Sequence, residues 1–213
     1  MRCDKKDLLL YGVTDRSWLG DRTLAQQVEA SLRGGATMIQ LREKHMDRGS
    51  ILAQALELRE LCGRYGVPLI LNDDAELAQA AGADGVHVGQ SDMEAGRVRA
   101  LLGEDKLIGV SARTVEQALA AQAAGADYLG VGAMFPTGTK QDTRPVSYDT
   151  LKAICAAVDI PVVAIGGIGA GNVAELAGSG IAGVAVVSAR YAQPDVEAAT
   201  RSLRAQVERV VGP

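Results

Sequence analysis

Short apolar runs alternate with longer amphipathic stretches along the whole chain. The runs are rich in Val, Ile and Leu, which is typical of parallel strands buried on both faces. Between them, apolar residues recur with helical spacing, as in TLAQQVEASLRGG (23–35) and TVEQALAAQAAG (114–125), and these stretches end in Gly, which tolerates a left-handed helix end. The eight predicted strands cover residues 8–14, 37–42, 68–72, 84–89, 106–111, 127–132, 161–166 and 183–188.

Eight strand-then-helix units, the last helix at about 195–210, predict a closed (β/α)8 TIM barrel. An internal echo supports repeated units: AGADGVHVG (81–89) recurs as AGADYLGVG (124–132) and more loosely as GGATMIQLR (34–42). The alternative is an open doubly wound sheet, which is expected to carry GxGxxG after an early strand. Here the first junction reads GVTDRSWLG (12–20), and we favour the barrel.

The composition fits one domain over residues 1–213. Hydrophobic residues make up 47% of the chain, and no linker or low-complexity segment divides it. The net charge is −4 and no basic stretch is interleaved with aromatics, so we expect no nucleic-acid partner. There is no apolar run long enough for a signal peptide or a membrane span, and we expect no membrane association.

Cys3, Cys62 and Cys155 are far apart, with no CxxC and no neighbouring His. This spacing argues against a disulfide framework or a zinc site and predicts a cytoplasmic protein. The sequence leaves the oligomeric state open, a homo-oligomer included.

The carboxyl ends of the strands form the working end of such a barrel, and polar residues collect there. After the second strand, Gln40, Arg42 and Lys44 alternate toward one side, which predicts an anion clamp. The alternative is that Arg42 and Lys44 are solvated or paired with Glu43 and Asp47.

The third strand ends in Asn72, Asp73 and Asp74, and Asp92 follows the fourth. Asp74 is predicted to cap the next helix, and Asp92 could also be a helix cap. Two carboxylates on adjacent strand ends, Asp73 and Asp92, alternatively predict a Mg²⁺ ion shared with a phosphate.

Later strand ends offer hydroxyls and flexible backbone. Ser111 follows the fifth strand, and the loop FPTGTKQDTRP (135–145) follows the sixth, with Thr137, Gly138, Thr139 and Lys140; it could also be an ordinary surface loop. After the seventh and eighth strands, the usual phosphate site of this barrel, come Gly166, Gly167, Gly169 and Ser188. For His45 and His87, with no nucleophile pattern near them, we expect structural roles.

Taken in order, these strand ends resemble the thiamine-phosphate synthase family along nearly the whole chain. The matching segments are Gln40-Leu-Arg-Glu-Lys44, Asn72-Asp73, His87-Val-Gly-Gln-Ser-Asp92, Ser111, Pro136-Thr-Gly-Thr-Lys140, Gly166-Gly167-Ile168 and Val187-Ser188. The chain departs from the family at Gly132-Ala133, where Gly-Pro is common, and at Ala112-Arg113 after Ser111. The two departures leave the shape of the pyrimidine pocket open.

The resemblance implies a transferase of thiamine biosynthesis. A hydroxymethylpyrimidine diphosphate loses pyrophosphate, and the ring nitrogen of a thiazole phosphate bonds to the freed methylene. It implies that both partners are small molecules, with these roles for residues of this chain: Arg42, Lys44, Lys140 and Ser111 catalytic; Gln40, Arg42, Lys44, Asn72, Ser111 and Lys140 for the pyrimidine diphosphate; Thr137, Gly138, Thr139, Gly167, Val187 and Ser188 for the thiazole phosphate; Asp73 and Asp92 for Mg²⁺.

Three other functions compete with this one. A thiazole tautomerase would share the barrel and the thiazole-phosphate site but would not need the diphosphate and metal residues. A non-catalytic binder of thiazole phosphate would need no leaving-group residues such as Lys140. A sugar-phosphate epimerase would need paired acid–base groups, which the sequence does not offer. The residues do not distinguish thiazole phosphate from its carboxylate form, and they leave regulation open.

Overall fold

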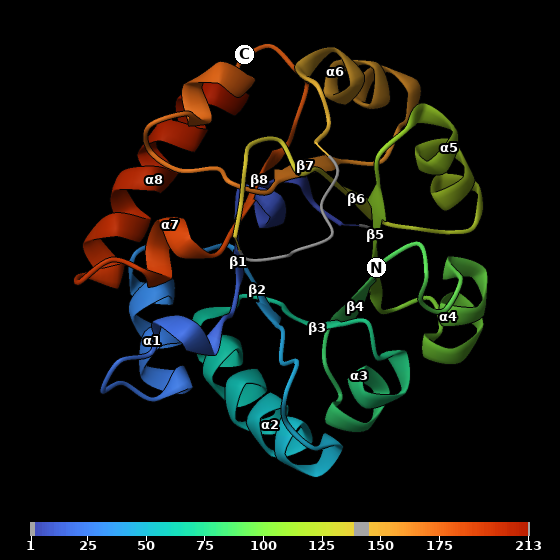
Figure 1. Cartoon of the computed structure of the whole chain (residues 1–213). Coiled ribbons are helices and arrows are strands. Elements are labelled where there is room, and N and C mark those ends of the chain that lie inside the picture. The colour runs from blue at the N-terminus through green and yellow to red at the C-terminus, as the bar shows by residue number, and fades with distance from the viewer. Residues whose placement is uncertain (1–2, 139–144, 213) are drawn as a thin grey trace.

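The predicted barrel is confirmed by the computed structural model, which describes residues 3–138 and 145–212. All strands are parallel and each pairs with both neighbours, β8 returning to β1, so that the sheet is closed (Figure 1). The strands are β1 Leu10–Val13, β2 Met38–Leu41, β3 Leu69–Asn72, β4 Gly85–Val88, β5 Leu107–Ala112, β6 Tyr128–Val131, β7 Val162–Ile165 and β8 Gly183–Val186.

The helices form a ring around the strands (Figure 1). The seventh unit differs from the others, since the connection from β7 to β8 holds a short 3₁₀-helix, η3 (Val173–Leu176), in place of an α-helix. The α-helices are α1 Leu24–Arg33, α2 Arg48–Tyr65, α3 Ala75–Ala81, α4 Ala95–Leu102, α5 Val115–Ala123, α6 Tyr148–Ala157, α7 Ser188–Tyr191 and α8 Val196–Val211, and two further 3₁₀-helices are η1 Lys5–Leu8 and η2 Arg16–Trp18.

Alternation along the strands divides the core into two parts. Side chains that point outward pack against the helices in one large aliphatic cluster. Those that point inward fill the barrel lumen, and η1 contributes Leu8 at the amino end of the strands. The lumen cluster comprises Leu8, Tyr11, Val13, Met38, Ile70, Leu107, Tyr128, Val163 and Ala185.

The internal echo of the sequence has a structural cause at the amino end of the barrel. Asp84 receives a hydrogen bond on Oδ2 from the Leu69 amide at 2.8 Å, and its own amide donates to the Leu69 carbonyl. Asp127 does the same with Ile108, and Thr37, which takes the Asp position in the looser copy, does so with Leu10 through its hydroxyl. The repeated residue therefore forms hydrogen bonds to the first residues of the preceding strand. These bonds lie at the end of the barrel opposite to the predicted site.

None of the helices within residues 3–138 and 145–212 is both long and apolar enough to cross a membrane.

Removal of the Asp127 carboxylate should destabilise the barrel. This group accepts from the Ile108 amide and forms a largely buried ion pair with Arg99 at 2.6 Å. Asp127→Ala leaves the Ile108 amide without its acceptor and the Arg99 guanidinium without its carboxylate, and we expect it to lower the free energy of unfolding by about 3 kcal/mol. The exposed Glu60, which pairs with Arg64, provides the control, and Glu60→Ala should cost at most about 0.5 kcal/mol. Equal denaturant midpoints for the two variants would contradict this role.

Candidate active site

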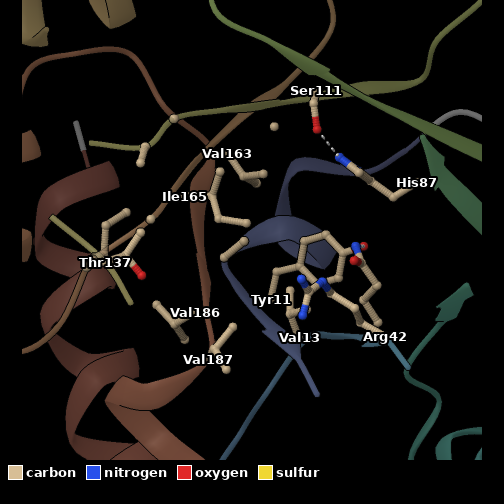
Figure 2. A pocket seen from close by; sticks show the side chains of 18 of the residues that line it. Tyr11, Val13, Arg42, His87, Ser111, Thr137, Val163, Ile165, Val186 and Val187 are labelled. Carbon is tan, nitrogen blue, oxygen red and sulfur yellow. Dashed lines mark hydrogen bonds between the residues drawn. The ribbon is translucent and has the colours of Figure 1, made fainter. Parts of the chain in front are cut away.

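One pocket opens at the carboxyl ends of the strands, where the sequence predicts the site. Figure 2 shows His87 and Ser111 on one side of it, with Thr137 and Val187 across from them. Because parallel strands all end at the same rim, residues from β1 to the start of α7 meet here. The lining residues are Tyr11, Val13, Gln40, Arg42, Asn72, His87, Ser111, Arg113, Gly130, Gly132, Ala133, Thr137, Val163, Ile165, Gly166, Gly167, Ile168, Ala185, Val186, Val187 and Ser188.

Most of the predicted substrate residues lie around this pocket. Those that line it are Gln40, Arg42, Asn72, Ser111, Thr137, Gly167, Val187 and Ser188. Lys44, Gly138 and the two carboxylates Asp73 and Asp92 do not line it. Thr139 and Lys140 lie outside the described residues.

Thr14 holds the backbone of Arg42, and the Arg42 side chain lines the pocket. The buried Thr14 hydroxyl accepts from the Arg42 amide at 3.0 Å and donates to its carbonyl at 3.4 Å. Atom Nη2 of Arg42 is buried and has no hydrogen-bond partner within the described residues. A buried donor without a partner lowers the stability of the fold. This property is expected of a group that binds an anionic ligand.

The acidic neighbour of Arg42 forms its ion pair with a different residue. Glu43 forms its ion pair with Arg16 of η2, at 2.8 Å, and burial raises the pKa of the Glu43 carboxyl while Arg16 opposes that rise. Across the described part of the chain, neither Arg42 nor the exposed Lys44 has an ion-pair partner. The alternative in which Glu43 and Asp47 pair with these two cations therefore does not hold for the described residues.

The carboxylates after β3 and β4 are separately anchored. Asp74 caps α3, as predicted, through the Leu77 amide at 2.7 Å. Asp73 has a left-handed backbone (φ 66°), an uncommon conformation for a residue with a side chain, and its Oδ2 accepts from Asn72 Nδ2 at 2.6 Å. Its amide donates to the His87 carbonyl at 2.8 Å, which places its backbone beside β4.

The interpretation of Asp92 as a helix cap is wrong. Helix α4 begins at Ala95, and its N-cap is Glu94. Asp92 instead turns back to β4, where its Oδ2 accepts from the Gly89 amide at 2.7 Å. Asp73 and Asp92 are thus both anchored around the carboxyl end of β4.

The opposite wall of the pocket is built from backbone packed closely together. Gly167 has a φ of +67°, and a Cβ there would lie 2.5 Å from the carbonyl oxygen of Pro136, so only glycine fits. The Phe135 amide donates to the Gly166 carbonyl at 3.0 Å, which ties the loop after β6 to the loop after β7. Asn172 bridges Gly167 and Gly169 with both ends of its amide and fixes that glycine turn.

Sequence reasoning missed several residues that line the pocket. Tyr11 and His87 project from the strands into its floor, and Arg113 lies at its rim after β5. His87 bonds to Ser111 through Nε2 at 3.0 Å, so its contacts include a predicted site residue (Figure 2). Asn72 pairs with His87 across β3 and β4, and paired strand residues share a face. This pairing is the signal that would have assigned His87 to the same site as Asn72.

The chain is similar to proteins of one kind over nearly its whole length. The family model described as thiamine monophosphate synthase matches residues 10–189. The thiamine-phosphate synthase of Chloroflexus aurantiacus is 50% identical over 202 residues, which are 94% of this chain and 93% of that protein. The thiamine-phosphate synthase of Ruminiclostridium cellulolyticum is 48% identical over 199 residues, which are 93% of this chain and 95% of that protein.

A solved structure agrees with these relatives. The thiamine phosphate pyrophosphorylase of Pyrococcus furiosus superposes with a TM-score of 0.90 at 38% identity, and the match covers 98% of this chain and 99% of that one. The chain belongs to the thiamine monophosphate synthase family.

Proposed function

We propose that this chain is a transferase that condenses 4-amino-2-methyl-5-hydroxymethylpyrimidine diphosphate with thiazole phosphate to give thiamine phosphate and pyrophosphate. The bond between the pyrimidine methylene and the diphosphate oxygen breaks, and the thiazole ring nitrogen forms the new bond to that methylene. The observation that carries the proposal is one pocket with a cation, Arg42, that has no ion-pair partner among the described residues on one side, and a glycine and hydroxyl wall on the other. Such a pocket offers one subsite to a diphosphate and another to a phosphate.

The residues of the first subsite stabilise the leaving group. As the carbon–oxygen bond breaks, negative charge grows on the diphosphate, and Arg42 is already directed into the pocket by the Thr14 contact to its backbone. A charge held in place before the reaction stabilises the transition state without further reorganisation. Lys44 and Lys140 would add to this charge, and Gln40, Asn72 and Ser111 would orient the pyrimidine ring.

The second subsite would hold the thiazole phosphate. Thr137 and Ser188 offer hydroxyls, and the Gly166–Gly167 turn and Val187 offer close approach to backbone amides. Apolar side chains between the subsites, Ile165 and Val186 among them, keep water from the bond-forming atoms (Figure 2).

The carboxylates after β3 and β4 fit a magnesium ion. Both are hard oxygen ligands, and in each a short hydrogen bond to one oxygen orients the group, from Asn72 to Asp73 and from Gly89 to Asp92. The described residues hold no cluster of three His, Cys, Asp or Glu, so the remaining ligands would come from the diphosphate, as is typical of Mg²⁺. When bound, the ion would offset the charge of the departing pyrophosphate.

The proposal is tested by incubating the purified protein with both substrates and Mg²⁺. Mass spectrometry should detect thiamine phosphate and pyrophosphate, and neither should form when one substrate is left out or when a chelator removes the metal. If no product forms and thiazole phosphate alone is isomerised, the chain is a tautomerase. Binding of thiazole phosphate with neither reaction would make it a non-catalytic binder.

Neutralising Arg42 should slow the reaction and leave the fold intact. We expect Arg42→Gln to reduce kcat by about 10²–10³-fold, the loss typical of an electrostatic donor to a transition state. Thiazole-phosphate affinity should change far less, because Thr137 and Ser188 lie on the other wall. Arg64→Gln is the matched control, since Arg64 lies on the exposed end of α2 and should leave kcat unchanged. Near-normal turnover by Arg42→Gln would remove Arg42 from the catalytic residues.

Replacing the carboxylates by amides should separate metal binding from structure. Asp92→Asn keeps an oxygen that accepts from the Gly89 amide, so its melting temperature should stay close to that of the wild type. Turnover should fall sharply in limiting Mg²⁺ and recover in part at high Mg²⁺, and Asp73→Asn should behave alike. Full activity of both variants at limiting Mg²⁺ would leave Asp73 and Asp92 with structural roles only.

A further inference from the structure

Five polar side chains form one continuous line of hydrogen bonds across the barrel lumen. Gln40 Nε2 lies 2.7 Å from Tyr11 Oη, which lies 2.9 Å from Tyr128 Oη. Tyr128 Oη lies 3.2 Å from His87 Nδ1, and His87 Nε2 lies 3.0 Å from Ser111 Oγ. The residues come from β2, β1, β6, β4 and β5 in that order. The line therefore runs along the floor of the pocket and joins two of its walls.

Gly109 and Gly130 leave room for the side chains of this line. A Cβ at Gly109 of β5 would lie 2.4 Å from His87 Nδ1, and it would also overlap the Tyr128 ring. A Cβ at Gly130 of β6 would lie 3.0 Å from His87 Cε1. A glycine in a strand interior marks a site where another group approaches closely, and here those groups are the His87 and Tyr128 rings.

The direction of the line follows from its first member. An amide nitrogen can only donate, so Tyr11 Oη accepts from Gln40. Either tyrosine could donate in the Tyr11–Tyr128 bond, and we assign the donor to Tyr11, because Tyr128 Oη is the acceptor that the described residues offer to its proton. With Tyr11 as donor to Tyr128, the Tyr128 proton is directed at His87 Nδ1, and this arrangement requires an unprotonated Nδ1 with the imidazole proton on Nε2. Nε2–H donates to Ser111 Oγ, which leaves the Ser111 hydroxyl proton to be donated elsewhere.

Arg42 favours this orientation of the Gln40 amide. Gln40 and Arg42 are two positions apart at the end of β2, so they share a side, and both line the pocket. With its nitrogen on Tyr11, the amide presents its oxygen on the side that it shares with a guanidinium. On that shared side of the strand end, the guanidinium charge favours an amide oxygen over NH₂ donors.

Burial keeps both tyrosines in the form that the line requires. Tyr11 and Tyr128 are fully buried, and burial raises the pKa of each phenol well above its usual value. Since both pKa values move upward, the two hydroxyls carry their protons throughout the neutral range.

We propose that Tyr11 and Tyr128 are positioning residues that hold His87 in its Nε2–H tautomer and thereby make Ser111 a hydrogen-bond donor to the pocket. His87 is then more than a core residue, because its tautomer decides whether Ser111 offers a proton or only lone pairs. The consequence for substrate rests on the proposed function: a ring nitrogen of the pyrimidine is an acceptor and needs such a donor. The tautomer itself does not depend on any substrate.

The tautomer is measured by ¹⁵N NMR of histidine-labelled protein without ligand. The chain has two histidines, so His45→Gln assigns the signals of His87. We expect His87 to show a protonated Nε2 and an unprotonated Nδ1. Tyr128→Phe removes the donor to Nδ1 and should give a mixture of tautomers, and Tyr11→Phe, one step further back, should do so in part. A protonated Nδ1 in the wild type, or an unchanged tautomer in both variants, would overturn the proposal.

Activity supplies the second readout. Tyr128→Phe should lower kcat/KM for the pyrimidine diphosphate by about two- to tenfold, the effect of one neutral hydrogen bond, and leave the KM for thiazole phosphate unchanged. Tyr65→Phe is the matched control, since it loses a hydroxyl that bonds to Glu29 on the surface, and should alter neither. An equal loss for both substrates would indicate a merely structural role. If the protein has no transferase activity at all, the NMR result still decides the tautomer.

Discussion

Pairing of β8 with β1 closes the sheet, and the geometry of the site depends on that closure. In a closed parallel barrel every strand has two neighbours, so all backbone groups of the strands are paired and all carboxyl ends lie on one rim. Residues as far apart in the chain as Tyr11 and Ser188 then line one pocket. An open sheet of the same strands would separate the Arg42 side of the pocket from the Val187 side.

Closure also creates a lumen, and the chain fills it in two different ways. The part toward the amino ends of the strands holds apolar side chains such as Leu8, Met38 and Leu107. The part toward the carboxyl ends holds the hydrogen-bonded line from Gln40 to Ser111, for which Gly109 and Gly130 leave room. Buried polar groups are stable only when they are partnered, and a line with every member bonded satisfies that condition while it directs Ser111 toward the pocket.

Charged side chains have different roles at the two ends of the barrel. At the amino end of the barrel, Arg99 is paired with Asp127 at 2.6 Å and contributes to stability. At the carboxyl end, Glu43 is paired with Arg16, and Arg42 is left without a carboxylate among the described residues. An unpaired cation in a pocket lowers stability slightly and raises affinity for an anion, which is the exchange expected at a binding site.

The sequence alone determined the fold, and it placed the candidate site at the carboxyl ends of the strands. Eight apolar runs separated by helical patterns left few topologies, and strand-end residues such as Arg42 and Ser111 had to meet once the sheet was closed. Only the tertiary structure decided which groups are partnered. It showed that Asp92 bonds to Gly89 instead of capping α4, and that Glu43 pairs with Arg16. Such partners lie on separate segments at distances that no local pattern encodes. The line through Tyr11, Tyr128 and His87 likewise joins strands far apart in the chain, so period and spacing cannot predict it.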